Sequence, residues 1–412
     1  MPVSRPRMNR MSRFRLSPLL CMALLVAPSS LPAAPAAAQS VGQQREDVLF
    51  WSQARRDRDF SRLYRIFPAD HVAAGTHVRT LPTGTPLQPV WTDGTNIDTY
   101  MKRFHIAGVM VLQDGRVRLR RYAAHFGPDK HWTSFSVAKS VTSMLLGIAL
   151  EQGAITSLDD ALATYIPSLK GSAYADVTVR QLLTMTSGVR WNEDYTDPHS
   201  DVARMYRAPC RDGQPHILPY LAKLSRQWPA GTHFNYNTAE TDLLGILVQR
   251  ATHQSLAAYL SEHIWKPYGM ASDAHWLKDE CDGSDTGGSG LSATLADYAR
   301  LGQFMLEGGR IDGKPVMASA WMRGAVTGQQ RLDDPRHDYG YLWWTDSDGS
   351  YAAMGIFGQM VYIDPARHLV IAQVAAWPHA WGKQEVAARR AFVAAVKRAV
   401  DPSEPAHADS AG

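Results

Sequence analysis

Several common sequence signatures are missing from this chain of 412 residues, and each absence argues against a class of function. No G-x-S-x-G elbow occurs, which argues against an α/β-hydrolase. No H-E-x-x-H or paired-cysteine motif occurs, so the 15 histidines do not indicate a metal site. No dinucleotide or Walker loop occurs, so no cofactor is expected. No apolar run is long enough for a membrane span.

The first 38 residues differ in composition from the rest of the chain. Residues 1–16 contain five arginines and no acid, a short apolar run follows, and small residues lead to Ala38. This order is typical of a secretory signal peptide cleaved near Ala38, so we expect a periplasmic or secreted protein. The apolar run is short for the alternative, an uncleaved anchor. The five arginines account for the formal charge of +4, so the remainder has no basic patch that predicts nucleic-acid binding.

Cysteine is scarce, with three in the whole chain. Cys21 lies in the leader, which leaves Cys210 and Cys281 as candidates for a disulfide. An oxidising compartment favours such a bond. Two separately buried thiols remain the alternative, because the sequence does not show whether the two Cα atoms approach each other.

The pattern of elements predicts an α+β fold. Residues 39–100 have little periodicity and are interpreted as an irregular N-terminal arm. β-Rich segments at 105–113 and 117–122 flank Asp114-Gly115, which is a hairpin signal. Helical periodicity then dominates up to about residue 308, and short β-rich segments return before a last helix. We therefore predict an antiparallel sheet flanked by helices, with an inserted helical lobe, in a domain over residues 101–400. Residues 401–412 are predicted to be a disordered tail. The predicted elements are helices at 134–152, 178–185, 239–251, 293–307 and 385–400, and strands at 341–344, 359–363 and 369–375.

The main chemical signal is Ser136 followed by Lys139 at the start of an apolar helix. Residues three apart lie on one helical face, so the hydroxyl and the amine can meet. A serine hydroxyl needs a base to become a nucleophile, and a lysine can act as that base when burial lowers its pKa. Backbone N–H groups at the helix N-terminus can stabilise an oxyanion. A surface serine and lysine on an ordinary helix are the alternative.

Five blocks in order resemble the landmarks of the serine β-lactamase and penicillin-binding-protein superfamily, in particular relatives of class C. The similarity covers about residues 100–400, and its closest branch is that of esterases and 6-aminohexanoate-dimer hydrolases. The blocks lie at 132–143, 178–188, 229–238, 287–294 and 355–359. The resemblance implies that Ser136 is the nucleophile, Lys139 its general base and Tyr236 a second acid–base group.

Two motifs depart from the family pattern. Relatives have Tyr-x-Asn where this chain has Tyr236-Asn237-Thr238, so Asn237 is a candidate for the missing substrate contact. Relatives have a cation before Thr-Gly where this chain has Ile356-Phe357-Gly358. Because an apolar motif cannot pair with a carboxylate, we expect an ester or an uncharged amide as substrate.

Further candidates complete the predicted site. The backbone N–H groups of Ser136 and Gln359 are the expected oxyanion donors. Ile356, Phe357 and Gly358 are expected to contact substrate, and glycine would permit close approach to the strand. Asp194 and Tyr195 are possible contacts at the mouth of the cleft, with ordinary loop residues as the alternative.

The resulting hypothesis is a serine hydrolase that acts on a small-molecule ester or amide through an acyl-enzyme. One alternative is a β-lactamase or D-Ala-D-Ala carboxypeptidase. The other is a non-catalytic binding protein on the same scaffold. No metal, cofactor or nucleic-acid partner is expected, nor is a stable membrane span after removal of the leader.

Overall fold

The computed structural model describes residues 48–210, 213–332 and 337–401. The predicted leader and all but the first residue of the predicted tail lie outside these ranges. Within them, no helix combines the length and the apolar character needed to cross a membrane.

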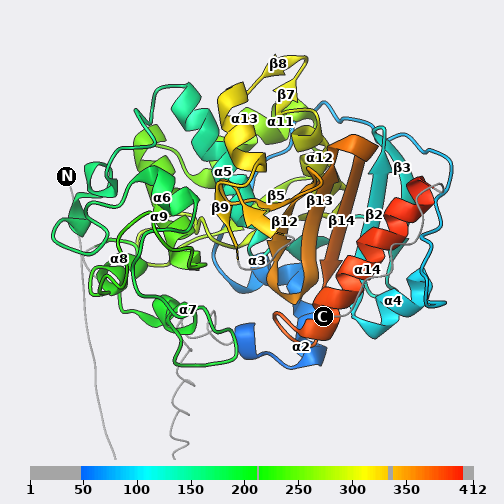
Figure 1. The fold of residues 1–412 in the computed structure, drawn as a ribbon, viewed down its shortest axis with the longest axis horizontal. Coiled ribbons are helices and arrows are strands. Elements are labelled where there is room, and N and C mark those ends of the chain that lie inside the picture. Colours follow the sequence, from blue (N-terminus) through cyan, green and yellow to red (C-terminus); the bar gives the residue numbers. More distant parts are fainter. Residues whose placement is uncertain (1–47, 211–212, 333–336, 402–412) are drawn as a thin grey trace, which may run out of the picture. The chain divides into compact units, whose positions relative to one another are not determined.

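The main sheet pairs an early hairpin, residues 106–122, with late strands between residues 330 and 375 (Figure 1). The hairpin of β2 and β3 pairs through β2 with the late strand β14, and every pairing in the sheet is antiparallel. Asp114 and Gly115 form the predicted turn with φ of 51° and 71°, the backbone that a tight hairpin requires. In sheet order the strands are β3 (Arg116–Tyr122), β2 (Ile106–Gln113), β14 (Leu369–Ala375), β13 (Gln359–Asp364), β12 (Tyr351–Gly355), β11 (Trp344–Asp346), β10 (His337–Tyr339) and β9 (Gln330–Arg331).

A smaller antiparallel sheet contains the strand that precedes helix α5 (Val137–Glu151). Its strands, in order, are β1 (Ala69–Val72), β5 (Ala274–Leu277), β6 (Leu291–Thr294) and β4 (His131–Thr133). Strand β1 belongs to the predicted N-terminal arm, which is therefore tied into a sheet rather than only packed on the surface. A further short pair is β7 (Arg310–Ile311) with β8 (Lys314–Pro315).

Helices lie on both faces of the main sheet. Gly302 of α12 comes so close to Val370 that a Cβ atom there would lie 2.5 Å from the valine side chain. On the other face, the hydroxyl of Tyr100 in α4 donates to Gln373, which alternates with Val370 along β14. The ring of Phe392 in α14 stacks on Tyr100 at 4.9 Å, which fastens α14 to that face. These helices are α4 (Ile97–Arg103), α12 (Leu295–Leu306) and α14 (Lys383–Val400).

The helical lobe is built around α5, a helix buried along most of its length. It packs on α9, and α9 in turn packs on α6. The predicted helix at 178–185 is present as α6, which begins with a reciprocal capping box between Thr178 and Gln181. The remaining helices are α2 (Gln53–Asp59), α3 (Leu63–Ile66), α5 (Val137–Glu151), α6 (Val179–Leu183), α7 (Asp201–Arg204), α8 (Ile217–Leu221), α9 (Thr238–Thr252), α10 (Leu256–Leu260), α11 (Lys266–Tyr268) and α13 (Ser319–Val326).

One predicted strand is displaced. Of the segment 341–344, only Trp344 lies in a strand. Leu342 has a φ of 62°, which is incompatible with a strand, and its carbonyl accepts a hydrogen bond from Ser140 of α5. The carbonyl of Tyr341 accepts in the same way from Ser143. Hydroxyls of helix α5 thus hold this segment as a turn, an interaction that its own β-rich composition does not reveal.

Candidate active site

Ser136 stands where strand β4 gives way to helix α5. The preceding residue, Phe135, has a left-handed φ of 43°, and its ring packs against Phe60 and Phe357. This packing holds the sharp turn in place. The Ser136 side chain makes no capping bond to its own helix, so its hydroxyl is left to interact with Lys139.

Lys139 lies beneath the hydroxyl with 1 % of its surface exposed. Its Nζ is 2.9 Å from Ser136 Oγ, 3.0 Å from Thr238 Oγ1 and 2.8 Å from the carbonyl oxygen of Gly288. Burial lowers the pKa of Lys139 to about 8, although the carboxylates of Glu193 and Asp242 oppose that shift. An amine with such a pKa can accept a proton near neutral pH.

Tyr236 lies on the segment that enters helix α9. Lys139 Nζ lies 5.2 Å from the centroid of its ring, and Trp344 stacks on the ring at 5.7 Å. Burial raises the pKa of Tyr236 well above its usual value, with a further increase from Glu193, while a hydrogen bond with Ser136 opposes both. Tyr236 therefore holds its proton at neutral pH.

Glu193 is a charged group that the sequence analysis did not select. Its carboxylate accepts hydrogen bonds from the Tyr195 hydroxyl at 2.8 Å and from the Thr238 backbone at 3.1 Å. It also accepts from the Thr238 hydroxyl and from the indole of Trp191. Glu193 is thus connected through one hydroxyl to Lys139. Its neighbour Asp194 turns outward and accepts from Thr196 instead.

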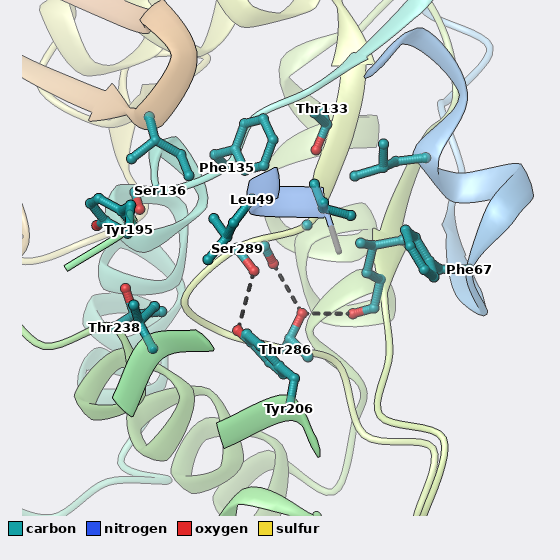
Figure 2. A pocket seen from close by; sticks show the side chains of 16 residues that line it. Leu49, Phe67, Thr133, Phe135, Ser136, Tyr195, Tyr206, Thr238, Thr286 and Ser289 are labelled. Atoms are coloured by element: carbon teal, nitrogen blue, oxygen red, sulfur yellow. Dashed lines mark hydrogen bonds between the residues drawn. The ribbon is translucent and has the colours of Figure 1, made fainter. Parts of the chain in front are cut away.

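Two cavities meet at the serine, and Ser136, Tyr195 and Ile356 line both. The smaller, of about 80 Å³, extends from Ser136 toward Phe67 and is mostly apolar (Figure 2). Part of its wall comes from the N-terminal arm, including Leu49. The larger, of about 300 Å³, also has Tyr236 in its wall. The proton-bearing tyrosine therefore faces the larger cavity.

The comparisons with known proteins identify the family. The Beta-lactamase family model matches residues 95–395. The chain belongs to the beta-lactamase family.

This chain is similar to two proteins that carry the name of a 6-aminohexanoate-dimer hydrolase. It is 29 % identical over 345 residues to a 6-aminohexanoate-dimer hydrolase of Paenarthrobacter ureafaciens, which covers 80 % of this chain and 87 % of the relative. A solved structure from Bacillus anthracis that carries the name of a 6-aminohexanoate-dimer hydrolase has a TM-score of 0.74 at 22 % identity, over 84 % of this chain and 94 % of its own. The predicted α+β, beta-lactamase/transpeptidase-like fold is therefore confirmed.

A more distant structure shows the breadth of this fold. A penicillin-binding protein from Bacillus halodurans has a TM-score of 0.58 at 17 % identity, over 72 % of this chain and 99 % of its own. At that identity the likeness concerns the fold alone.

Several predicted contacts of this beta-lactamase-family chain lie elsewhere. Among the described residues that line the two cavities, Asn237, Phe357, Gly358 and Asp194 do not occur. Asn237 is buried and caps α9 through the N–H groups of Ala239 and Glu240. A Cβ atom on Gly358 would lie 2.5 Å from the indole of Trp377, so packing and its φ of 94° require the glycine, not an approaching substrate.

Gln359 is also absent from both walls. Its side chain turns into the sheet, where its amide Nε2 donates hydrogen bonds to the carbonyl oxygens of Ile356, Phe357 and Ala375. Ile356, three residues earlier, lines both cavities beside Ser136. Of these two residues, Ile356 is therefore the one that lies beside the cavities.

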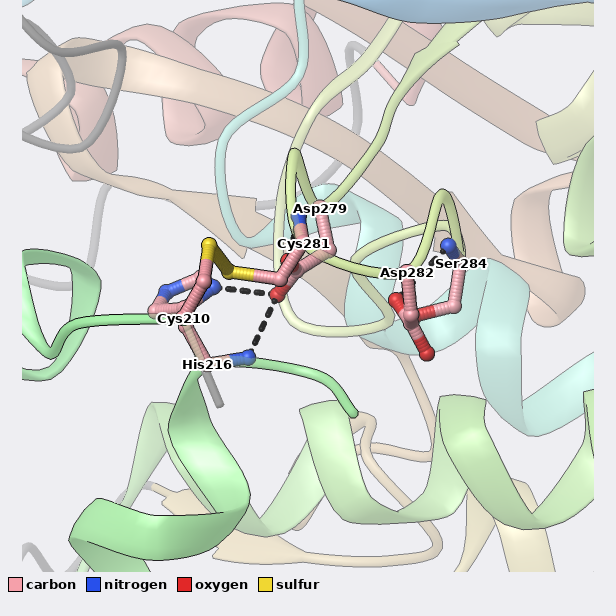
Figure 3. The surroundings of a disulfide bond; sticks show 6 residues. All are labelled: Cys210, His216, Asp279, Cys281, Asp282 and Ser284. Atoms are coloured by element: carbon pink, nitrogen blue, oxygen red, sulfur yellow. Dashed lines mark hydrogen bonds and ion pairs between the residues drawn. A yellow bond between two sulfur atoms is a disulfide. The ribbon is translucent and has the colours of Figure 1, made fainter. Parts of the chain in front are cut away.

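Cys210 and Cys281 form a disulfide with their Cα atoms 5.3 Å apart (Figure 3). The bond joins the segment after α7 to the loop after β5. His216, Asp279 and Cys281 lie together beside it. Because the sulfur of Cys281 is bonded to Cys210, it offers no thiolate, and two ligands remain, too few for a stable metal site. His216 and Asp279 instead form a buried ion pair.

Proposed function

We propose that this chain is a serine hydrolase that cleaves an ester or amide bond through an acyl-enzyme on Ser136. The observation that carries the proposal is the 2.9 Å contact between Lys139 Nζ and Ser136 Oγ in a buried setting. Burial lowers the pKa of Lys139 to about 8. A neutral amine at this distance can take the serine proton as the hydroxyl attacks a carbonyl.

The tetrahedral intermediate requires hydrogen-bond donors for its negative oxygen. The N–H of Ser136, at the N-terminus of α5, is one candidate. The N–H of Ile356 is the second, because Ile356 lines both cavities beside Ser136. This replaces Gln359 in the assignment made from the sequence.

Tyr236 completes the acylation half-reaction. It keeps its proton at neutral pH and can pass that proton to the leaving oxygen or nitrogen as the bond between the carbonyl carbon and the leaving group breaks. The proton that Lys139 took from Ser136 then restores the tyrosine hydroxyl. Because Tyr236 lines the larger cavity, the leaving group occupies that side and the acyl group occupies the smaller, apolar cavity. Lys139, neutral again, then takes a proton from water as this water attacks the acyl carbon. The acid product leaves, and the proton returns to Ser136 Oγ.

The decisive experiment compares the wild type with Ser136→Ala on p-nitrophenyl acetate and butyrate, with nitrocefin in parallel. We expect ester turnover that falls by about 10³-fold or more in Ser136→Ala. Ser134→Ala is the matched control, since that hydroxyl bonds the carbonyl of Phe135 and does not line either cavity. Equal turnover in the wild type and Ser136→Ala would remove Ser136 from the mechanism.

The same assay separates the alternatives. Rapid nitrocefin cleavage would favour a β-lactamase or D-Ala-D-Ala carboxypeptidase over an esterase. Absence of any product burst, together with no labelling of Ser136 by a fluorophosphonate, would favour a non-catalytic binding protein.

We also propose that the protein acts in the periplasm or outside the cell. The disulfide between Cys210 and Cys281 supports this, because such bonds persist in oxidising compartments. Fractionation of cells that express the full chain, with N-terminal sequencing of the exported product near Ala38, tests the proposal. Full-length protein retained in the cytosol would contradict it.

A further inference from the structure

Arg389 is a buried cation in the wall of the larger cavity. It lies on α14, outside every block that resembles the family motifs, and 4 % of its surface is exposed. The same cavity is lined by Ser136 and Tyr236, so the arginine shares a cavity with the proposed nucleophile and proton donor.

The guanidinium of Arg389 is held in place but not neutralised. Its Cζ lies 5.2 Å from the ring centroid of Trp377 and 5.0 Å from that of Trp381, and its Nη2 donates to the sulfur of Met354 at 3.1 Å. Its Nη1 has no hydrogen-bond partner. Among the described residues no carboxylate forms an ion pair with it. Glu385, one turn earlier on α14, is paired with His379 at 2.8 Å.

Such an arrangement is unfavourable unless something else supplies the anion. A buried charge without a counter-ion loses its hydration, and the two cation–π contacts and the bond to sulfur compensate only part of that loss. Burial lowers the pKa of Arg389 to about 10, so the group is still charged at neutral pH. The acid in the same cavity wall, Glu193, already accepts bonds from Trp191, Tyr195 and Thr238, and it forms no ion pair with Arg389.

We propose that Arg389 binds a carboxylate carried by the leaving part of the substrate. The inference rests on the proposed function for the assignment of the larger cavity to the leaving group. A guanidinium is well suited to a carboxylate, since its N–H groups can form two parallel charge-assisted bonds. The cation that the third motif lacks at Ile356 is thus supplied from another element, and the expectation of an uncharged substrate is replaced by that of an anionic one.

Two esters with the same acyl group test the inference. They are 3-acetoxybenzoate, whose leaving group carries a carboxylate, and its methyl ester, whose leaving group is neutral. We expect wild-type kcat/KM to favour the carboxylate by about tenfold or more, mainly through KM. This preference should disappear in Arg389→Met and persist in part in Arg389→Lys. Lys383→Met is the matched control, because it removes an exposed positive charge from the same helix.

A binding measurement keeps the inference independent of turnover. Titration calorimetry compares 3-hydroxybenzoate with 3-hydroxybenzamide on wild type and on Arg389→Met. We expect the carboxylate to bind more tightly than the amide to wild type alone. Equal binding of the two ligands to wild type, or the same preference in a folded Arg389→Met, would overturn the inference.

The outcomes distinguish this inference from the proposed function. Hydrolysis of both esters without a carboxylate preference would leave the hydrolase standing and remove the role of Arg389. Absence of hydrolysis, together with Arg389-dependent carboxylate binding, would contradict the proposed hydrolase and leave the role of Arg389 standing. If Arg389→Met does not fold, the inference is tested by the binding of 3-hydroxybenzoate and 3-hydroxybenzamide to the wild type and to Arg389→Lys.

Discussion

Lys139 donates a hydrogen bond from Nζ to the Oγ1 of Thr238 over 3.0 Å. The same hydroxyl donates to Glu193, so it links the proposed base to a carboxylate. Thr238 occupies the position at which the Tyr-x-Asn motif of the relatives has its asparagine.

The first prediction concerns this hydroxyl. Thr238→Val keeps the shape of the side chain and removes both hydrogen bonds, so kcat should fall by about 10- to 100-fold. Thr238→Ser should retain most activity. The comparison is made by steady-state ester hydrolysis at saturating substrate. Full activity in Thr238→Val would show that the hydroxyl is not needed to orient Lys139.

The second prediction concerns pH. Lys139 must be neutral to accept a proton, and its pKa is about 8, so kcat/KM should rise with pH through about 8 and then level off. Glu193 raises the pKa of Lys139. Glu193→Gln should therefore move the midpoint of the rise to lower pH. Asp194→Asn removes the same charge from the exposed neighbour and should leave the midpoint in place. Unchanged midpoints in both variants would contradict the coupling between Glu193 and Lys139.

The third prediction concerns acyl-chain length. Leu49 lines the apolar cavity of about 80 Å³ that we assign to the acyl group. Leu49→Ala should enlarge it, so the ratio of kcat/KM for p-nitrophenyl hexanoate over acetate should rise about tenfold. Phe50→Ala is the control, because Phe50 is exposed and lies outside the cavity wall. A ratio that changes equally in both variants would argue against the assignment.

The fourth prediction concerns the disulfide, which closes a loop with a sequence separation of 71. Replacing both Cys210 and Cys281 with serine should lower the free energy of unfolding by about 2–4 kcal/mol, measured by urea denaturation. Reductant should destabilise the wild type to a similar extent and leave the double variant unaffected. An effect of reductant on the double variant would point to a cause other than this bond.

Much of the site was predictable from the sequence because its determinants are local. A spacing of three residues on one helix brings Ser136 and Lys139 together whatever the rest of the chain does. The hairpin at Asp114-Gly115 and the capping box at Thr178 depend likewise on short-range backbone geometry. Resemblance to the family then indicated Tyr236, which the structure places beside Lys139.

The sequence could not show which of two nearby residues has its side chain directed toward the site. Glu193 and Asp194 are adjacent acids in one loop, and the direction in which each side chain turns depends on Thr238 and Tyr195. A similar ambiguity affected Ile356 and Gln359. The hairpin between β12 and β13 orients one toward the cavities and the other into the sheet.

The sequence by itself therefore determined most of the elements, since these follow from periodicity, capping and short spacing, and its resemblance to the family indicated the proposed nucleophile and its base. The tertiary structure alone decided which groups surround them. It brings Leu49 of the N-terminal arm and Arg389 of the last helix to the cavities that meet at Ser136. Contacts between segments far apart in the sequence depend on how whole elements pack, and no local pattern in the chain encodes them.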